Sequence, residues 1–253
     1  MEFSKEFIDR LSTAKSVVFF TGAGISAESG ISTFRGKDGI WNKLRPEELA
    51  NFNAFMKNPN MVWEWYQYRR KIINESLPNP GHYAIAQFEK YVEKVAVVTQ
   101  NVDNLHGRAG SKTIYELHGN IERNFCIKCN TFYNSADYHF ADEAPKCDKC
   151  GGLVRPDVVW FGEMLPQEVF AEAEKTAEWS DICFVVGTSA VVYPAAYIPI
   201  NARKNGSYIV EINIESTELT SLADYSIFGK SGEILPLILD EVKENYRTRI
   251  NPA

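Results

Sequence analysis

The chain lacks several features that define membrane, secreted or nucleic-acid-binding proteins. No apolar run reaches the roughly 18–20 residues that span a bilayer, and the mixed-charge stretch of residues 1–15 lacks the basic-then-apolar pattern of a signal peptide. Basic residues are outnumbered, with 27 Lys and Arg against 33 Asp and Glu, so binding to a phosphate backbone is disfavoured. We therefore expect a cytoplasmic protein that binds neither nucleic acid nor membrane, while cationic protein segments remain compatible partners.

Cysteine is also scarce, with five residues in 253, yet four of the five lie close together. They form the pairs Cys126-x2-Cys129 and Cys147-x2-Cys150 with seventeen residues between them, which is typical of a four-thiolate zinc ribbon. Two disulfides or a redox dithiol are the alternatives, and a reducing cytosol disfavours them. Because four protein ligands leave no position for substrate, the predicted zinc is structural. The fifth, Cys183, is interpreted as a small buried hydrophobic residue.

Short β-branched runs bounded by turn residues predict strands that are buried on both faces. These strands are predicted at Ser16–Phe20, Val95–Thr99, Ile182–Val186 and Tyr208–Ile212. Helical patterns fall between them, at His82–Tyr91, Gln167–Ala177 and Tyr197–Lys204. Strands that alternate with helices predict the α/β class, with a Rossmann-like doubly wound parallel sheet.

Two segments interrupt this alternation. Residues 37–80 are aromatic-rich and predicted to be helical, and residues 120–156 are turn-rich and hold the four clustered cysteines. We interpret them as a helical insertion and a zinc-ribbon module that together form a smaller lobe. The Rossmann-like domain then comprises residues 1–36, 81–119 and 157–253.

A glycine-rich turn follows the first predicted strand and opens a helix in the pattern G-x-G-x-x-A. Small residues there let backbone N–H groups approach a pyrophosphate. The candidate cofactor-binding residues of this turn are Gly22, Ala23, Gly24 and Ser26. Many tight turns share this pattern, and no acidic residue ends a second strand about twenty residues on, as a standard dehydrogenase requires. Phe34 and Arg35, further along, could supply an apolar lid and a phosphate or ribose contact, or could simply lie in a surface loop.

Two further motifs make the pattern specific. Gln100-Asn101-Val102-Asp103 follows the second strand, and Leu117-His118-Gly119 precedes the cysteine module. Together with the glycine turn they resemble the sirtuins, the NAD-dependent protein lysine deacylases, over about residues 16–232. Further matching stretches lie later in the chain, at Val158–Glu163, Gly187–Ser189 and Asn213–Glu215.

The resemblance implies that His118 is the catalytic base. In sirtuin chemistry nicotinamide leaves the ribose, and the acyl-lysine carbonyl oxygen attacks the ribose carbon to give an alkylimidate. The histidine then activates a ribose hydroxyl, which traps the acyl group as O-acyl-ADP-ribose. An unperturbed imidazole pKa of about 6.5 suits this proton transfer. The alternative interpretation is a capping or core histidine.

The resemblance also assigns residues to NAD and to the acyl-lysine substrate. The nicotinamide and nucleotide contacts it implies are Gln100, Asn101, Asp103, Gly187, Thr188, Ser189, Asn213, Ile214, Glu215 and Ser231. A substrate peptide is expected to add as a strand between two segments, which consist of Phe161, Gly162 and Glu163 and of Val191, Val192 and Tyr193. The sequence predicts no oligomeric state.

Tyr66 and Arg69 are three residues apart in the helical insertion, so a helix places them on one face. They resemble the Tyr-x-x-Arg pair with which one sirtuin subgroup binds the carboxylate of succinyl and malonyl groups, and arginine suits a carboxylate because of its forked donors. The alternative is an aromatic core face with a snorkelling arginine. The small Ala27 fits a roomy acyl channel, and an acetyl group fits the same channel without using the pair.

Ser32 departs from the resemblance, since sirtuins usually have proline there, and a looser NAD-covering loop is expected. Two other functions stay open. One is mono-ADP-ribosyl transfer, and the other is a non-enzymatic zinc-ribbon binding protein, which would have no use for His118, Asn101 and Asp103 together. We further predict that the zinc braces one wall of the catalytic cleft.

Overall fold

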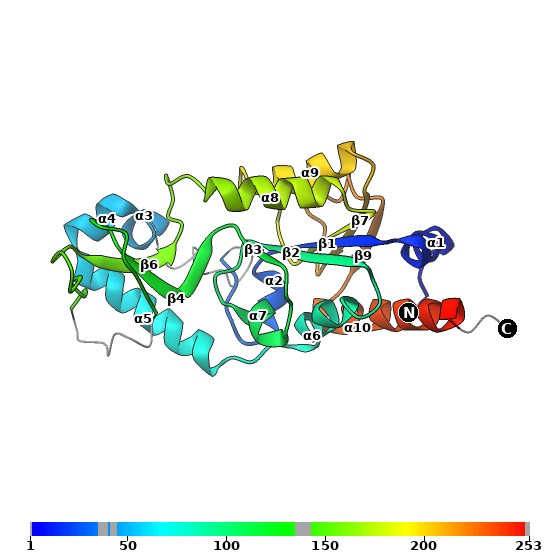
Figure 1. Cartoon of the computed structure of the whole chain (residues 1–253), viewed down its shortest axis with the longest axis horizontal. Coiled ribbons are helices and arrows are strands. Elements are labelled where there is room, and N and C mark those ends of the chain that lie inside the picture. Colours follow the sequence, from blue (N-terminus) through cyan, green and yellow to red (C-terminus); the bar gives the residue numbers. More distant parts are fainter. Residues whose placement is uncertain (1, 35–39, 41–44, 135–142, 251–253) are drawn as a thin grey trace.

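The computed structural model describes residues 2–34, 40, 45–134 and 143–250 of the chain. They form a larger lobe, in which helices cover both faces of a sheet, and a smaller lobe beside it (Figure 1). None of the helices in these ranges is both long enough and apolar enough to cross a membrane.

The larger lobe is built on a six-stranded sheet in the order β3-β2-β1-β7-β8-β9. All neighbouring strands are parallel, and Val17 of the central strand lies opposite Val95 on one side and Ile182 on the other. The strands are β1 (Ser16–Thr21), β2 (Lys94–Thr99), β3 (Ile114–Glu116), β7 (Ile182–Val186), β8 (Tyr208–Asn213) and β9 (Tyr225–Phe228). This topology confirms the predicted doubly wound α/β fold.

Side chains alternate between two apolar cores because successive strand residues point to opposite faces. Phe19 and Phe184 stack at 5.0 Å between ring centroids in the first core, whereas Phe20 and Val185 lie in the second. The helices on the first side are α1 (Lys5–Thr13), α2 (Gly24–Ala27), α6 (Pro80–Phe88), α7 (Leu105–Ala109) and α10 (Ser231–Ile250). The helices on the second side are α8 (Gln167–Glu178) and α9 (Tyr197–Lys204).

The smaller lobe combines the two segments that interrupt the alternation. Its antiparallel sheet has the order β5-β4-β6, with β4 (Gly119–Cys126), β5 (Phe132–Asn134) and β6 (Val154–Val158). Its helices are α3 (Pro46–Leu49), α4 (Phe52–Lys57) and α5 (Pro59–Glu75). The two insertions share one core, in which Phe55 and Tyr66 of the helices pack with Ile121 and Trp160.

Gly119 forms the joint between the two lobes, directly after the candidate base His118. Its φ of +79° is a conformation that only glycine adopts without strain. A Cβ atom there would lie 2.1 Å from the carbonyl oxygen of Asp157 on β6, so the two strands pack at a distance that excludes any side chain. Glycine is therefore required at this position for two independent reasons.

We expect Gly119→Ala to destabilise the protein far more than Gly206→Ala. Gly206 also has a positive φ but open space around it. Its alanine variant should therefore lose only about 1–2 kcal/mol of unfolding free energy, because the left-handed backbone strains an alanine. The Gly119 variant should lose about 1–3 kcal/mol more through the backbone clash. Urea unfolding of both variants measures the difference, and equal losses would show that β6 moves aside freely.

Candidate active site and zinc centre

The predicted cofactor residues follow strands β1, β2, β7 and β8, which all end at the same edge of the sheet. The chain moves from β1 outward to β2 and β3, and later returns beside β1 to build β7, β8 and β9. A reversal of this kind leaves a crevice between the two central strands, and ligands of open α/β sheets bind there. The fold therefore places the candidate site at the carboxyl ends of β1 and β7.

The turns after β1 and β7 are joined through their backbones. The amide of Gly22 donates to the carbonyl of Val186 at 3.0 Å, and that of Gly24 donates to the carbonyl of Gly187 at 2.8 Å. A Cβ atom on Gly24 would lie 2.7 Å from the Cα of Gly187. The glycines thus serve a contact between two turns, a packing role that the nucleotide interpretation of the sequence did not include.

Three strand ends meet at Thr188. Its hydroxyl accepts from Nε2 of Gln100 at 2.9 Å, and its carbonyl accepts from Nδ2 of Asn213 at 3.0 Å. Ile214 and Glu215 lie exposed after β8, and Ser189 is half-buried. The predicted nucleotide residues from β2, β7 and β8 are therefore neighbours at this edge.

A second cluster surrounds Ser26 of α2. Its hydroxyl donates to Oδ2 of Asp103 at 2.7 Å and accepts from Nδ2 of Asn101 at 3.3 Å. Burial raises the pKa of the Asp103 carboxyl, and hydrogen bonds from the Leu105 amide and from Ser26 oppose this rise. The two residues predicted to line the nicotinamide pocket are thus connected through Ser26.

Sequence reasoning missed two buried histidines behind this cluster. His82 accepts from the Asn79 amide at Nδ1, 3.3 Å away, so its Nε2–H faces the Ser26 hydroxyl at 3.4 Å. The ring centroids of His82 and His106 are 4.9 Å apart. Burial lowers the pKa of His82 to about 4 and that of His106 well below its usual value. Both rings therefore stay neutral at pH 7. His82 contacts Ser26, whereas Nε2 of His106 lies 3.0 Å from the hydroxyl oxygen of Thr21. No spacing in the sequence signals this arrangement.

His118 lies half-buried at the entrance to the smaller lobe. Its Nδ1 is 2.9 Å from the carbonyl oxygen of Gln100, and because a carbonyl can only accept, Nδ1 carries the proton of the neutral ring. The lone pair then resides on Nε2. The backbone carbonyl of His118 also accepts from the Val159 amide at 2.9 Å. The contact with Gln100 thus fixes the tautomer of the neutral imidazole.

Tyr66 and Arg69, the pair predicted to bind the acyl carboxylate, lie on α5 and are almost fully buried. The Tyr66 oxygen accepts from Nε1 of Trp160 at 2.8 Å. The Arg69 guanidinium stacks on the rings of Phe34 and Trp65, at 4.6 Å and 5.2 Å from their centroids. Burial lowers the pKa of Arg69. Within the described residues this guanidinium has no hydrogen-bond acceptor.

The two segments predicted to bind the peptide differ in how many of their groups bond to the rest of the protein. The Phe161 amide donates to Ala50 at 2.9 Å, whereas Gly162 is exposed with open space around it. The Glu163 carboxylate pairs with Arg155 and accepts from the Trp160 amide at 2.8 Å, so its side chain braces the turn. On the other segment, Val191 and Val192 are half-buried and Tyr193 is exposed.

The remaining predicted residues are placed as follows. Ser231 is the first residue of α10, and its hydroxyl donates to the Glu28 carboxylate at 3.4 Å. Ala27 and Ser32 are exposed. Arg35 lies outside the described residues.

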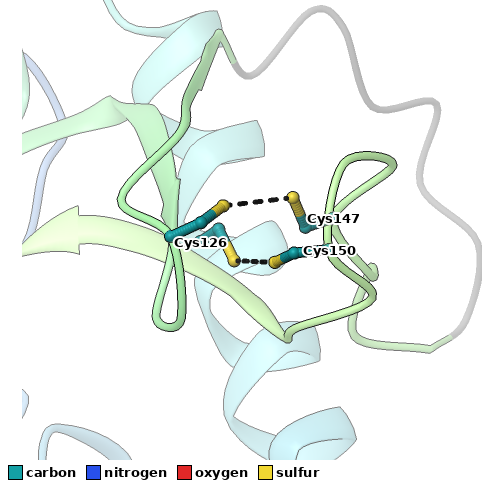
Figure 2. A group of neighbouring side chains, drawn as sticks. Cys126, Cys147 and Cys150 are labelled. Atoms are coloured by element: carbon teal, nitrogen blue, oxygen red, sulfur yellow. Dashed lines mark hydrogen bonds between the residues drawn. The ribbon is translucent and has the colours of Figure 1, made fainter.

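The four clustered cysteines converge from two loops (Figure 2). The Sγ atoms of Cys126 and Cys150 are 3.5 Å apart and those of Cys129 and Cys147 are 3.6 Å apart, while all four lie within 4.8 Å of one another. A disulfide needs about 2.05 Å, whereas Zn–S bonds near 2.3 Å put tetrahedral sulfurs about 3.8 Å apart. The cluster fits one structural zinc ion, as predicted. Cys183 is a buried free thiol in β7, and its burial raises its pKa to about 12.

Arg70 connects helix α5 to the zinc-bearing sheet. Its Nε donates to the carbonyl of Ile121 at 2.6 Å, and its guanidinium also bonds to Asn124. Both partners lie on β4, whose last residue is the zinc ligand Cys126. The zinc module and α5 are therefore linked through a buried arginine.

Comparison with known proteins identifies the class to which this fold and site belong. The model of the Sir2 family matches residues 22–194. A relative from Pyrobaculum aerophilum named NAD-dependent protein deacylase 2 is 52% identical over 95% of this chain and 96% of its own. The NAD-dependent protein deacylase of Pyrococcus abyssi is 50% identical over 92% of this chain and 95% of its own. The chain belongs to the Sir2 family, as its motifs predict.

Solved structures agree with the fold and with the predicted cofactor. A Sir2 homologue complex with ADP-ribose has a TM-score of 0.95 at 44% identity, covering 98% of this chain and 100% of that one. A Sir2 homologue complex with NAD has a TM-score of 0.91 at 45% identity, covering 97% and 96%. A Sir2 complex with a p53 peptide and NAD+ has a TM-score of 0.86 at 33% identity, covering 96% and 100%.

We expect Cys147→Ser to lower the zinc content of the protein well below one ion per chain. Without the ion, β4 and β6 lose the constraint that joins the two cysteine loops, so their backbone amides should exchange with solvent faster. Elemental analysis and hydrogen-exchange mass spectrometry measure the two effects. Cys183→Ala is the matched control and should keep its zinc. Unchanged amide exchange rates in a verified zinc-free variant would mean that the ion does not stabilise β4 and β6.

Proposed function

We propose that this protein is an NAD-dependent protein lysine deacylase that removes acetyl groups and, through Tyr66 and Arg69, succinyl and malonyl groups. The products would be nicotinamide and O-acyl-ADP-ribose. Membership of the Sir2 family and the deacylase names of relatives at about 50% identity support NAD-dependent deacylation. The exposed, open position of Gly162 supports backbone pairing with an acyl-lysine peptide.

His118 is the proposed general base. Its Nδ1–H bond to the carbonyl of Gln100 supports this role, because it leaves Nε2 able to accept a proton from a ribose hydroxyl. The other described histidines, His82 and His106, are buried and have strongly lowered pKa values. Neither of them has the exposure that proton transfer to a bound substrate needs.

The observation that carries the acyl specificity is the buried guanidinium of Arg69, which has no hydrogen-bond acceptor among the described residues. Burying an arginine without a hydrogen-bonded anion costs free energy, whereas the other two buried arginines of this lobe each have oxygen acceptors within the protein. Arg70 donates to the carbonyl of Ile121, and Arg155 pairs with Glu163. A carboxylate at the end of the acyl chain would accept two parallel hydrogen bonds from the Arg69 guanidinium.

A cytoplasmic location is also proposed. It is supported by the thiols, because none of the five cysteines forms a disulfide and reducing compartments maintain that state. Protein mono-ADP-ribosyl transfer uses the same co-substrate and is the rival outcome. Mass spectrometry of an incubated acyl-peptide separates the two, since deacylation removes the acyl mass and the rival adds ADP-ribose.

We expect His118→Tyr to abolish NAD-dependent deacylation of acetyl- and succinyl-peptides while leaving the fold intact. Loss of a general base removes about 10²–10⁴-fold in rate. Peptide turnover and the thermal unfolding midpoint are the measurements. Full activity in a folded variant would contradict the mechanism.

We expect Arg69→Met to lower kcat/KM for a succinyl-peptide by about 10–150-fold, from the loss of a charged hydrogen bond worth about 1.5–3 kcal/mol. Deacetylation should fall much less, because an acetyl group has no carboxylate. Arg70→Met is the matched control on the same helix, and it should lower both activities alike. Equal losses in the Arg69 variant would make that arginine a structural residue.

A further inference from the structure

Trp160 follows β6 and is 1% exposed, next to the exposed turn at Phe161 and Gly162. The indole ring has a single polar atom, the Nε1–H group. That group donates to the Tyr66 oxygen at 2.8 Å and in a buried environment. The hydrogen bond therefore links the proposed peptide segment to the proposed acyl pocket.

The indole ring is held from several sides. The Arg155 guanidinium lies over it at 3.3 Å from the ring centroid, and the Phe55 ring packs at 5.3 Å. Glu163 bonds both to Arg155 and to the Trp160 backbone amide. A ring that is held in this way presents its N–H group in a fixed direction.

The Tyr66 hydroxyl can both accept and donate a hydrogen bond. A phenol oxygen accepts from one side and donates its own proton in another direction. Burial raises the pKa of Tyr66 to about 12, so the proton is present at neutral pH. Within the described residues, the Trp160 bond is the one hydrogen bond of this hydroxyl, and its proton has no acceptor there. Trp160 thus occupies the accepting side and leaves the donating side for a ligand.

We propose that Trp160 is a specificity-determining positioning residue, whose indole N–H orients the Tyr66 hydroxyl proton toward the carboxylate of a succinyl or malonyl group. This role rests on the proposed function of Tyr66 and Arg69. Trp160 acts through Tyr66 and does not itself touch the reacting atoms. A ligand without a terminal carboxylate gains nothing from the arrangement, so the effect is selective for acidic acyl groups.

The test compares kcat/KM for succinyl- and acetyl-peptides in Trp160→Phe, Tyr66→Phe and the double variant. Phenylalanine keeps an aromatic ring but removes the N–H donor. We expect Trp160→Phe to lower the succinyl value by about five- to tenfold through KM, with less than about a twofold change for acetyl. In the Tyr66→Phe background the same substitution should have no further effect on the succinyl-to-acetyl ratio. Equal losses for both peptides, or independent losses in the double variant, would overturn the proposal.

Two further variants separate the hydrogen bond from packing. Phe55→Leu loosens the same cluster but keeps the N–H donor, so it should lower the unfolding midpoint and lower the succinyl-to-acetyl ratio much less than Trp160→Phe does. If Trp160→Phe does not fold, 3-benzothienylalanine at this position keeps the bicyclic shape and replaces N–H by sulfur. That analogue should reproduce the selective loss, and a wild-type ratio with it would overturn the proposal.

Arg69→Met distinguishes this proposal from the acyl assignment on which it rests. An unchanged succinyl-to-acetyl ratio in Arg69→Met would overturn the acyl assignment and the role of Trp160 with it. A ratio that falls in Arg69→Met but not in Trp160→Phe would overturn the role of Trp160 alone.

Discussion

The backbone contact between Gly24 and Gly187 is the constraint on which the rest of the site depends. The two turns bond directly, and neither has room for a side chain where they meet. Because β1 and β7 are fixed together there, Gln100 of the next strand end reaches Thr188. Ser26, two residues after Gly24, is brought beside Asp103. A wider turn at this point would separate the ends of β1 and β7, and with them the two halves of the nucleotide site.

Three buried arginines of the smaller lobe show how the cost of burying charge can indicate function. Arg70 and Arg155 have oxygen partners within the protein, and both connect structural elements. Arg69 has aromatic rings on its faces and no acceptor in the described part of the chain. Cation–π contacts stabilise a guanidinium but leave its N–H edge unsatisfied. The contrast among three residues of one type is what supports the proposed role of Arg69.

The sequence predicted the features that are local in the chain. Buried strands such as Ile182–Val186 are recognisable because β-branched runs are bounded by turns, and the cysteine pairs because a tetrahedral ion imposes their spacing. The short strand β3 and the edge strand β9 (Tyr225–Phe228), with their mixed polarity, carry no such signal. The bond from Trp160 to Tyr66 joins residues 94 positions apart, and the environment of His82 likewise depends on tertiary packing. Interactions of that kind follow from the fold and not from any pattern along the chain.

The contact between Phe34 and Arg69 has a thermodynamic consequence for the two proposed ligands. Phe34 belongs to the segment predicted to cover NAD, and its ring stacks on the guanidinium proposed to bind the acyl carboxylate. An acidic acyl group that draws Arg69 away from this ring changes the free energy of the covering segment. Linkage is reciprocal, so the co-substrate must then alter the affinity for that acyl group by the same factor. The binding of the two ligands would be coupled through a single stacked pair of side chains.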